Sequence, residues 1–193
     1  MTGQKLATVH WRALDREGED KCALAHADHG WVLLGHARFR DDDGFAALDY
    51  IIRCDPAWYA INADIAGSHG AREVKLRLDC EKGHWTLNGD PQPQVGLSRD
   101  LDLSFTPASN LMPLRRLAEG AAPSVSVRAA WLRYPDAALE PLDQSYIAGG
   151  TLDHVLYRAE QTGSSFRLQV HRCGFVTHYP GLWDGEVTEI ETD

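Results

Sequence analysis

The stretch Val74-Lys75-Leu76-Arg77-Leu78-Asp79-Cys80-Glu81 alternates strictly between apolar and charged side chains. Because successive side chains of a strand point to opposite faces, this stretch predicts a β-strand with one buried face and one hydrated face. That division is typical of an antiparallel sheet, in which one face covers the core and the other meets water.

The same alternation recurs through most of the chain. Comparable runs occupy residues 9–14, 21–26, 31–36, 124–133, 154–160, 166–172 and 175–179. Clusters of Asp, Asn, Gly and Pro that favour tight turns separate such runs, as at Asp41–Gly44 and Asn88–Pro91. This succession of strand and turn predicts a mainly β protein with minor α content and about eleven or more antiparallel strands.

One segment near the middle of the chain has the periodicity of a helix. Its apolar side chains at spacings of three and four share one helical face, and they are Leu111, Leu114, Leu117 and Ala118. Asn110 can cap this helix and Gly120 can end it. A helix of about ten residues is not stable alone in water, so we expect it to pack against the concave side of a curved sheet.

These elements predict the domain organisation. We expect a single domain over residues 1–193, because no Pro/Ser-rich linker divides the chain. Its large curved sheet would form two halves, residues 6–105 and 121–190, joined by the short helix near 110–118. We find no internal repeat that would make the two halves a duplication.

Composition and charge restrict the class of protein. The chain has 193 residues, of which 44% are hydrophobic and 24% charged, as in globular proteins and unlike disordered ones. Its net charge of −9 argues against a nucleic-acid partner, since phosphate binding needs a basic surface. Five acidic residues without a neighbouring base lie near the C-terminus: Asp184, Glu186, Glu189, Glu191 and Asp193. We therefore predict a solvated acidic tail over residues 184–193.

The sequence also indicates a cellular compartment. The first eight residues hold no apolar run typical of a signal peptide, and no stretch approaches the roughly 18–20 apolar residues of a membrane helix. The four cysteines lack C-x-x-C spacing, and they are Cys22, Cys54, Cys80 and Cys173. We expect them to be free thiols in a reducing environment. These features predict a cytoplasmic protein without a transmembrane segment, and they leave its oligomeric state open.

Metal-ligand and nucleophile motifs are absent from the sequence. Two loose sets of ligand types occur, one of Cys22, His26 and His29 and one of His171, Cys173 and His178, but neither has a known zinc spacing. The chain contains no G-x-S-x-G or H-E-x-x-H motif and no glycine-rich phosphate loop. We therefore predict no metal, no cofactor and no catalytic residue.

Asp100 and Asp102 form the carboxylate pair that invites an enzymatic interpretation. Two positions apart on a strand, they would share a face about 7 Å from each other, within the range of an inverting glycosidase. Catalytic carboxyls approach a sugar from opposite sides, however, so a structural or ligand-ordering role is favoured. Arg99, Arg115 or Arg116 could pair with these aspartates and fix the helix to the sheet. We expect the nearby Arg115 and Arg116 to lower the pKa values of both aspartates, which disfavours an acid catalyst.

Two of the six tryptophans are candidates for the rim of a binding site. Trp85 and Trp183 lie at predicted turns, and indole rings suit both sugar faces and lipid edges.

Five motifs along the chain together resemble a known family. In order, they are Gly83–Trp85, Asp100–Leu103, Thr106–Leu117, Gln144–Tyr146 and Gly174–Leu182. They are similar to the putative glycolipid-binding family, a group of bacterial proteins of about this length. The resemblance implies two half-barrels of antiparallel sheet, a fold similar to that of the periplasmic lipoprotein carriers, which hold acyl chains in a concave apolar face.

The resemblance and the residue chemistry together predict a non-catalytic binder of an amphiphile, a glycolipid or another lipid. Acyl chains would lie against the concave face, and the ligand-binding residues would be Trp85, Asp100, Asp102, Asn110, Arg115, Arg116, Gln144, Tyr146, Tyr179 and Trp183. The alternatives are a hydrolase of glycosides or esters that uses Asp100 and Asp102, and a structural or interaction module with a filled core. An aliphatic cavity of at least about 300 Å³ would favour the binder.

Overall fold

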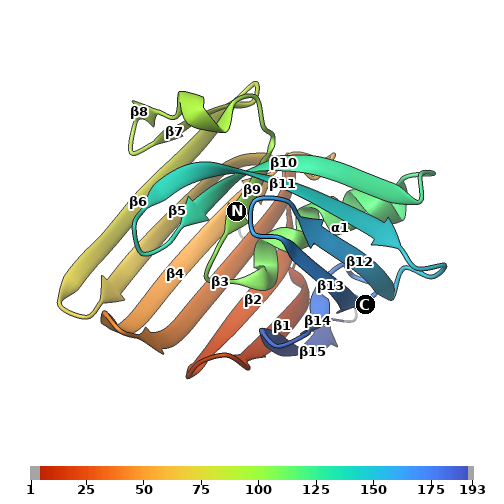
Figure 1. The fold of residues 1–193 in the computed structure, drawn as a ribbon, viewed down its shortest axis with the longest axis horizontal. Helices are drawn as coiled ribbons and strands as arrows, with labels where there is room; N and C mark the ends of the chain where they lie inside the picture. Colours follow the sequence, from red (N-terminus) through yellow and green to blue (C-terminus); the bar gives the residue numbers. More distant parts are fainter. Residues whose placement is uncertain (1–4, 191–193) are drawn as a thin grey trace.

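The computed structural model describes residues 5–190 and consists of one large curved sheet with a short helix inside it (Figure 1). Strands make up 63% of the described residues and helices 9%. The strands are β1 (Lys5–Ala13), β2 (Gly18–Ala27), β3 (Gly30–Asp41), β4 (Gly44–Cys54), β5 (Ala60–His69), β6 (Arg72–Glu81), β7 (His84–Leu87), β8 (Asp90–Pro91), β9 (Asp100–Leu103), β10 (Ser124–Arg133), β11 (Ala138–Ala148), β12 (His154–Ala159), β13 (Ser164–Val170), β14 (Val176–Tyr179) and β15 (Trp183–Glu189). The helices are the 3₁₀ turns η1 (Pro93–Val95) and η2 (Pro107–Asn110) and the α-helix α1 (Leu111–Glu119).

The strand order joins both ends of the chain at the centre of the sheet. It runs β8-β7-β6-β5-β4-β3-β2-β1-β15-β14-β13-β12-β11-β10-β9. β1 and β15 pair antiparallel, with Ala7 opposite Glu189 and Ala13 opposite Trp183. The sheet is not closed, and its outermost strands are β8 and β9. The predicted mainly β fold with one short helix is confirmed.

The strand β9 lies in a different half from the one that the sequence suggested. We expected residues up to 105 to belong with the N-terminal strands, but β9 pairs with β10, Asp100 lying opposite Ala129. This pair is parallel, whereas the other pairs among the described strands are antiparallel. Parallel neighbours need a crossover connection, and η2 with α1 supplies it. The N-terminal half of the sheet is therefore β1–β8 and the C-terminal half β9–β15.

The predicted acidic tail is wrong for the residues that the structure describes. Residues 184–189 belong to β15, which pairs with β1 along most of its length. The acids were misleading because β15 is amphipathic: Asp184 and Glu186 take one face, while Trp183 and Val187 take the other and pack against the core. Glu191 and Asp193 lie outside the described residues.

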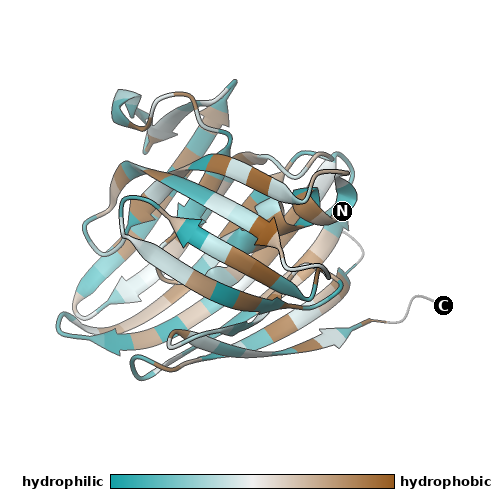
Figure 2. Ribbon diagram, turned by 45° about the vertical axis from the view of Figure 1, so that its right-hand side comes forward, coloured by the Kyte–Doolittle hydropathy of each residue, from teal (hydrophilic) through white to brown (hydrophobic). Residues whose placement is uncertain are grey.

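The strand alternation and the helix follow the sequence pattern closely (Figure 2). The stretch 74–81 lies within β6, where Leu78 is fully buried and Val74 is half-buried near the edge of the sheet. The predicted helix is α1, but Asn110 does not cap it with its side chain. Its amide instead donates to Tyr146, so this residue ties the start of α1 to the sheet.

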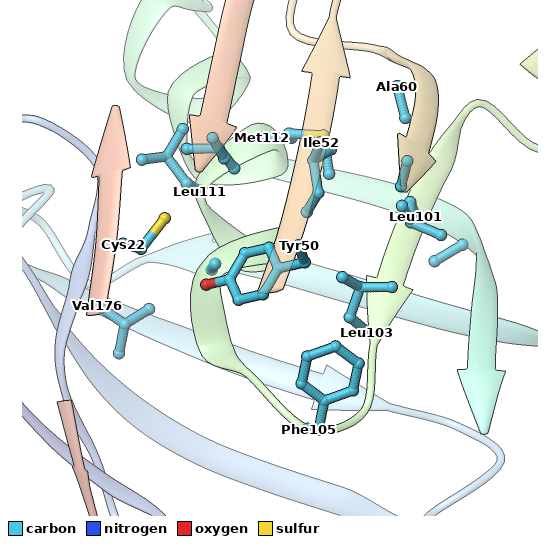
Figure 3. Packing of buried hydrophobic residues seen from close by; sticks show 14 of the residues in the cluster. Cys22, Tyr50, Ile52, Ala60, Leu101, Leu103, Phe105, Leu111, Met112 and Val176 are labelled. Carbon is cyan, nitrogen blue, oxygen red and sulfur yellow. The ribbon is translucent and has the colours of Figure 1, made fainter. Parts of the chain in front are cut away.

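The concave side of the sheet is largely filled by β9, η2 and α1. Leu111 and Met112 of α1 lie among Ile52 of the N-terminal half and Val176 of the C-terminal half (Figure 3). These side chains belong to a single buried cluster that spans both halves. Among residues 5–190, no helix has the length and apolar character that crossing a membrane requires.

Candidate functional site

Five of the predicted site residues gather on the inner face of the C-terminal half, where they form a hydrogen-bonded group with one further tyrosine, Tyr157. We call this group the inner polar cluster; its members are Asp102, Asn110, Gln144, Tyr146, Tyr157 and Tyr179. Tyr146 of β11 lies directly opposite Tyr157 of β12, and Gln144 precedes Tyr146 by two positions on the same face. The strand register therefore brings them together.

The hydrogen bonds of the inner polar cluster connect η2, which leads directly into α1, with β9, β11 and β12. Gln144 Nε2 donates to Asp102 Oδ2 at 2.7 Å and to the Tyr157 hydroxyl at 3.0 Å. Asn110 Nδ2 donates to the Tyr146 hydroxyl at 2.8 Å, and this hydroxyl donates to Gln144 Oε1 at 3.3 Å. A connected network of this kind fixes the position of α1 against the sheet.

The pKa of Asp102 moves in the opposite direction from our expectation. Burial raises the pKa of Asp102 to about 6, and the hydrogen bond from Gln144 only partly offsets that effect. The expected lowering of both pKa values by Arg115 and Arg116 is wrong. Burial also raises the pKa of Asp100, because it outweighs the attraction of Arg116.

Asp100 and Asp102 have different partners. Asp100 Oδ1 accepts a hydrogen bond from Arg116 Nη2 at 2.5 Å, with only 7% and 11% of the two side chains exposed. Arg116 also donates to the Trp58 carbonyl at 2.6 Å, and its guanidinium lies over the Tyr59 ring. The buried ion pair therefore attaches α1 to β9, and the bond to Trp58 attaches α1 to the turn after β4.

Arg115 lies on a different face of α1 from Arg116. Its Nη2 donates to Glu119 at 2.8 Å, and its guanidinium carbon lies 5.0 Å from the centre of the Trp58 ring. Its aliphatic stem packs on Gly174, where an added Cβ would come within 2.7 Å of Arg115 Cδ. A side chain at position 174 would therefore displace Arg115.

The two tryptophans that we expected at an exposed rim are both buried. Trp85 is 2% exposed and Trp183 is 6% exposed. Trp85 turns inward because its Nε1 donates to the Ser98 carbonyl at 2.9 Å, under the loop that follows η1. Trp183 begins β15 opposite Tyr179 and packs into the core. The rim position is therefore wrong for both residues.

A part of the concave face that α1 does not cover forms an apolar pocket. We call this cavity of about 220 Å³ the α1 pocket; its apolar lining consists of Leu114, Leu117, Ala118, Leu152, Val155 and Val170. Asp153, His171 and Arg172 also line it and make one side polar. Val155 and Tyr157 are successive inward positions of β12, so the α1 pocket and the inner polar cluster are neighbours on one strand.

Sequence reasoning did not single out the apolar lining of the α1 pocket. The inward alternation of β12 and β13 was visible, but it does not show which inward side chains the helix leaves uncovered. The volume is also below the roughly 300 Å³ that we set as the mark of an open binding cavity.

A larger groove of about 710 Å³ lies on the outer face of the sheet, across β1, β14 and β15. His10, Arg12, His178 and Glu186 line it, and His178 is already paired with Asp184 at 2.5 Å. Its charged lining does not suit an acyl chain, so we place the candidate site at the α1 pocket despite the smaller volume.

The sheet and its pocket together indicate the class of this protein. It is a small, mainly antiparallel β-protein whose open, curved sheet wraps around one short helix, with an apolar pocket beside that helix. The chain belongs to the family described as "Putative glycolipid-binding", whose sequence profile matches residues 8–185. The resemblance seen in its motifs is thereby confirmed. A solved structure of a DUF1089 family protein from Pseudomonas aeruginosa is similar, with 27% identity and a TM-score of 0.73 over 86% of this chain and 91% of that chain. No curated protein matches the chain significantly.

Proposed function

We propose that this protein binds an amphiphile, a glycolipid or another lipid, and catalyses no reaction on it. Part of an acyl chain occupies the α1 pocket, and the polar headgroup lies at the side formed by Asp153, His171 and Arg172. The observation that carries this proposal is the pairing of an aliphatic lining with that polar side within one cavity. The family to which the chain belongs supports the same class of ligand.

The chemistry of the polar side fits an amphiphile headgroup. The side chain of Arg172 is 80% exposed, and although its Nε and Nη2 donate to Glu189, the guanidinium has further N–H donors for a phosphate or carboxylate. Asp153 and His171 add groups that hydrogen-bond sugar hydroxyls. In this proposal the inner polar cluster positions α1 beside the ligand, and its members do not all touch it.

The volume of the α1 pocket limits the length of the acyl chain that it can hold. Ligand cavities commonly measure about 300–1,000 Å³, so a cavity of about 220 Å³ takes a short chain or one end of a longer one. Leu152 lies two positions after the adjacent glycines Gly149 and Gly150, and the residue is 45% exposed. Movement of this loop outward would lengthen the pocket for a longer chain.

A second candidate is hydrolysis of a glycoside or ester, and one observation favours it. With a pKa of about 6, Asp102 keeps part of its carboxyl protonated near neutral pH, as an acid catalyst requires. The proposed partner carboxylate, Asp100, is however held by Arg116. We therefore rank binding above hydrolysis.

The test is native mass spectrometry of the protein incubated with octyl glucoside, an amphiphile with a sugar headgroup and a short chain. Val170→Trp fills the α1 pocket, and Leu34→Trp places the same side chain at an exposed position of β3 as a control. We expect the wild type and the control to retain a bound molecule and Val170→Trp to lose at least tenfold in occupancy. Equal binding by all three proteins would refute the pocket as the site.

A further inference from the structure

Three side chains of metal-ligand type converge where the turn between β13 and β14 meets the end of β15. His171 Nδ1, Cys173 Sγ and a carboxylate oxygen of Glu189 all lie within 4.8 Å of one another. The imidazole nitrogen is 3.1 Å from the sulfur and 3.7 Å from Glu189 Oε1. They come from two separate segments, so only the fold brings them together.

These separations match those between the ligands of one zinc ion. With Zn–N near 2.0 Å, Zn–S near 2.3 Å and tetrahedral angles, nitrogen and sulfur lie about 3.6 Å apart and nitrogen and oxygen about 3.4 Å apart. The two observed distances differ from these by about 0.5 Å or less, which small side-chain rotations would correct. Imidazole and thiolate are also ligand types that suit Zn²⁺, whereas Mg²⁺ and Ca²⁺ favour oxygen ligands.

The backbone of the turn holds His171 and Cys173 in place. The N–H of His171 donates to the Phe175 carbonyl, and the N–H of Gly174 donates to the His171 carbonyl, both at 2.8 Å. Gly174 has a φ of +101°, which favours glycine, and it packs on Arg115. The N–H of Cys173 points at His171 Nδ1 at the long distance of 3.4 Å, and a metal bound to the same lone pair would displace this contact. The two ligand atoms are therefore directed to the same side of the turn.

The charges around the three residues are compatible with a divalent cation. Arg172 bonds both oxygens of Glu189, but each carboxylate oxygen retains a further lone pair for a metal. Hydrogen bonds to a ligating carboxylate are the usual way in which its orientation is fixed. A thiolate and a carboxylate together balance the double charge of the ion.

We propose that His171, Cys173 and Glu189 bind a divalent transition-metal ion, Zn²⁺ foremost, and leave its fourth position to water or another ligand. The sequence grouped His171 and Cys173 with His178, but His178 pairs with Asp184 on the outer face. The third ligand comes from β15, which no local spacing reveals. Metal binding here does not depend on lipid binding, although His171 also lines the α1 pocket.

The experiment is titration of the chelator-treated protein with Co²⁺, followed by competition with Zn²⁺. We expect one equivalent of Co²⁺ to give the near-ultraviolet thiolate band and the visible bands of a tetrahedral site, and Zn²⁺ to abolish them. Cys173→Ser should remove the thiolate band and weaken Zn²⁺ binding at least tenfold. Cys80→Ser, which changes another half-buried free cysteine, should alter neither.

A second variant separates metal ligation from folding. Glu189→Gln should weaken Zn²⁺ binding at least tenfold while the metal-free protein keeps its circular dichroism spectrum and melting temperature. Absence of a thiolate band in the wild type, loss of that band in Cys80→Ser, or Zn²⁺ binding unchanged in both Cys173→Ser and Glu189→Gln would each overturn the proposal.

Discussion

The two halves of the sheet carry different side chains on their inner faces. In β1–β8 the inward positions are mostly aliphatic and fully covered, as with Leu33, Leu48 and Ile52. In β9–β15 they include the tyrosines and the glutamine of the inner polar cluster, and Val155 and Val170 border a cavity. The same alternation thus builds both halves, but in the C-terminal half a connected polar cluster lies beside the uncovered apolar surface of the α1 pocket. In the N-terminal half, Val74 and Leu76 of β6 border a smaller cavity of about 180 Å³ near the edge of the sheet.

One inward-facing aspartate in each half, Asp20 and Asp102, shows the same contrast. Asp20 is fully buried and accepts hydrogen bonds from the Tyr50 and Thr106 hydroxyls and from the His36 N–H. Asp102 has one side-chain donor, Gln144. Gly35 leaves room for the Tyr50 ring, because an added Cβ there would lie 1.8 Å from Tyr50 Cζ. Burial raises the pKa of both carboxyls, but the N-terminal acid fastens η2 to the sheet through three donors, whereas the C-terminal one has a single side-chain donor.

The largest effect should come from the N-terminal half. Leu48→Ala removes a fully buried side chain and leaves a cavity, so we expect the free energy of unfolding to fall by about 2–5 kcal/mol. Urea denaturation measures this change. Binding of octyl glucoside to the folded fraction should stay within about twofold of wild type, and a specific loss of binding would break the division between the halves.

The next largest effect concerns Asp102 and depends on pH. Because its folded-state pKa of about 6 exceeds the usual value near 4, the folded protein binds more protons than the unfolded chain between these values. The contribution of Asp102 to stability is therefore highest below about pH 4 and declines as the pH rises through 6. Asp102→Asn should stabilise the protein by up to about 2–3 kcal/mol at pH 8 and change little at pH 4.

A control for this prediction lies on the outer face of β11. Hydrogen bonding to Arg128 lowers the pKa of Asp143, so its contribution is present at neutral pH and is lost as the pH falls. Asp143→Asn should therefore destabilise the protein at pH 8 rather than stabilise it. Denaturation of both variants across pH 4–8 distinguishes the two signs, and a common sign would contradict the contrast.

A smaller effect is expected from the network itself. Tyr146→Phe leaves the Asn110 amide without its buried acceptor, which should lower the free energy of unfolding by about 1–2 kcal/mol. Replacing both partners, with Asn110→Leu added, should recover part of this loss because no buried polar group is then unsatisfied. If the double variant lost more free energy of unfolding than the two single variants lose together, the two side chains would not be coupled in the way proposed.

The smallest effect on stability should come from the pocket wall. Val170 already borders a cavity, so Val170→Ala should lower the free energy of unfolding by less than about 1 kcal/mol. It should nevertheless weaken octyl glucoside binding, because it removes apolar surface that meets the acyl chain. Calorimetric titration beside thermal melting tests both; a large loss of stability without weaker binding would place Val170 in the scaffold.

The sequence predicted what local periodicity controls. The alternation of β6 and the spacing of Leu111, Leu114 and Leu117 identified a sheet and a helix that the structure contains. The acids of β15 concealed its alternation, and they suggested a tail where a central strand lies. The buried tryptophans were misplaced because a turn in the sequence does not reveal which loop folds over it.

The site was predictable only in part, for a similar reason. The family motifs pointed to Asp102, Asn110, Gln144 and Tyr146, which the structure brings together. The α1 pocket depends on how far a nine-residue helix reaches across β12 and β13, which no spacing encodes.

Methyl-detected NMR of the protein titrated with octyl glucoside tests the division between the two halves most directly. We predict that the methyl signals of Leu114, Leu117, Val155 and Val170 shift together and saturably, while those of Leu33, Leu48 and Ile52 do not move. Shifts centred on the N-terminal half, or none at the α1 pocket while the glycoside binds elsewhere, would contradict the account.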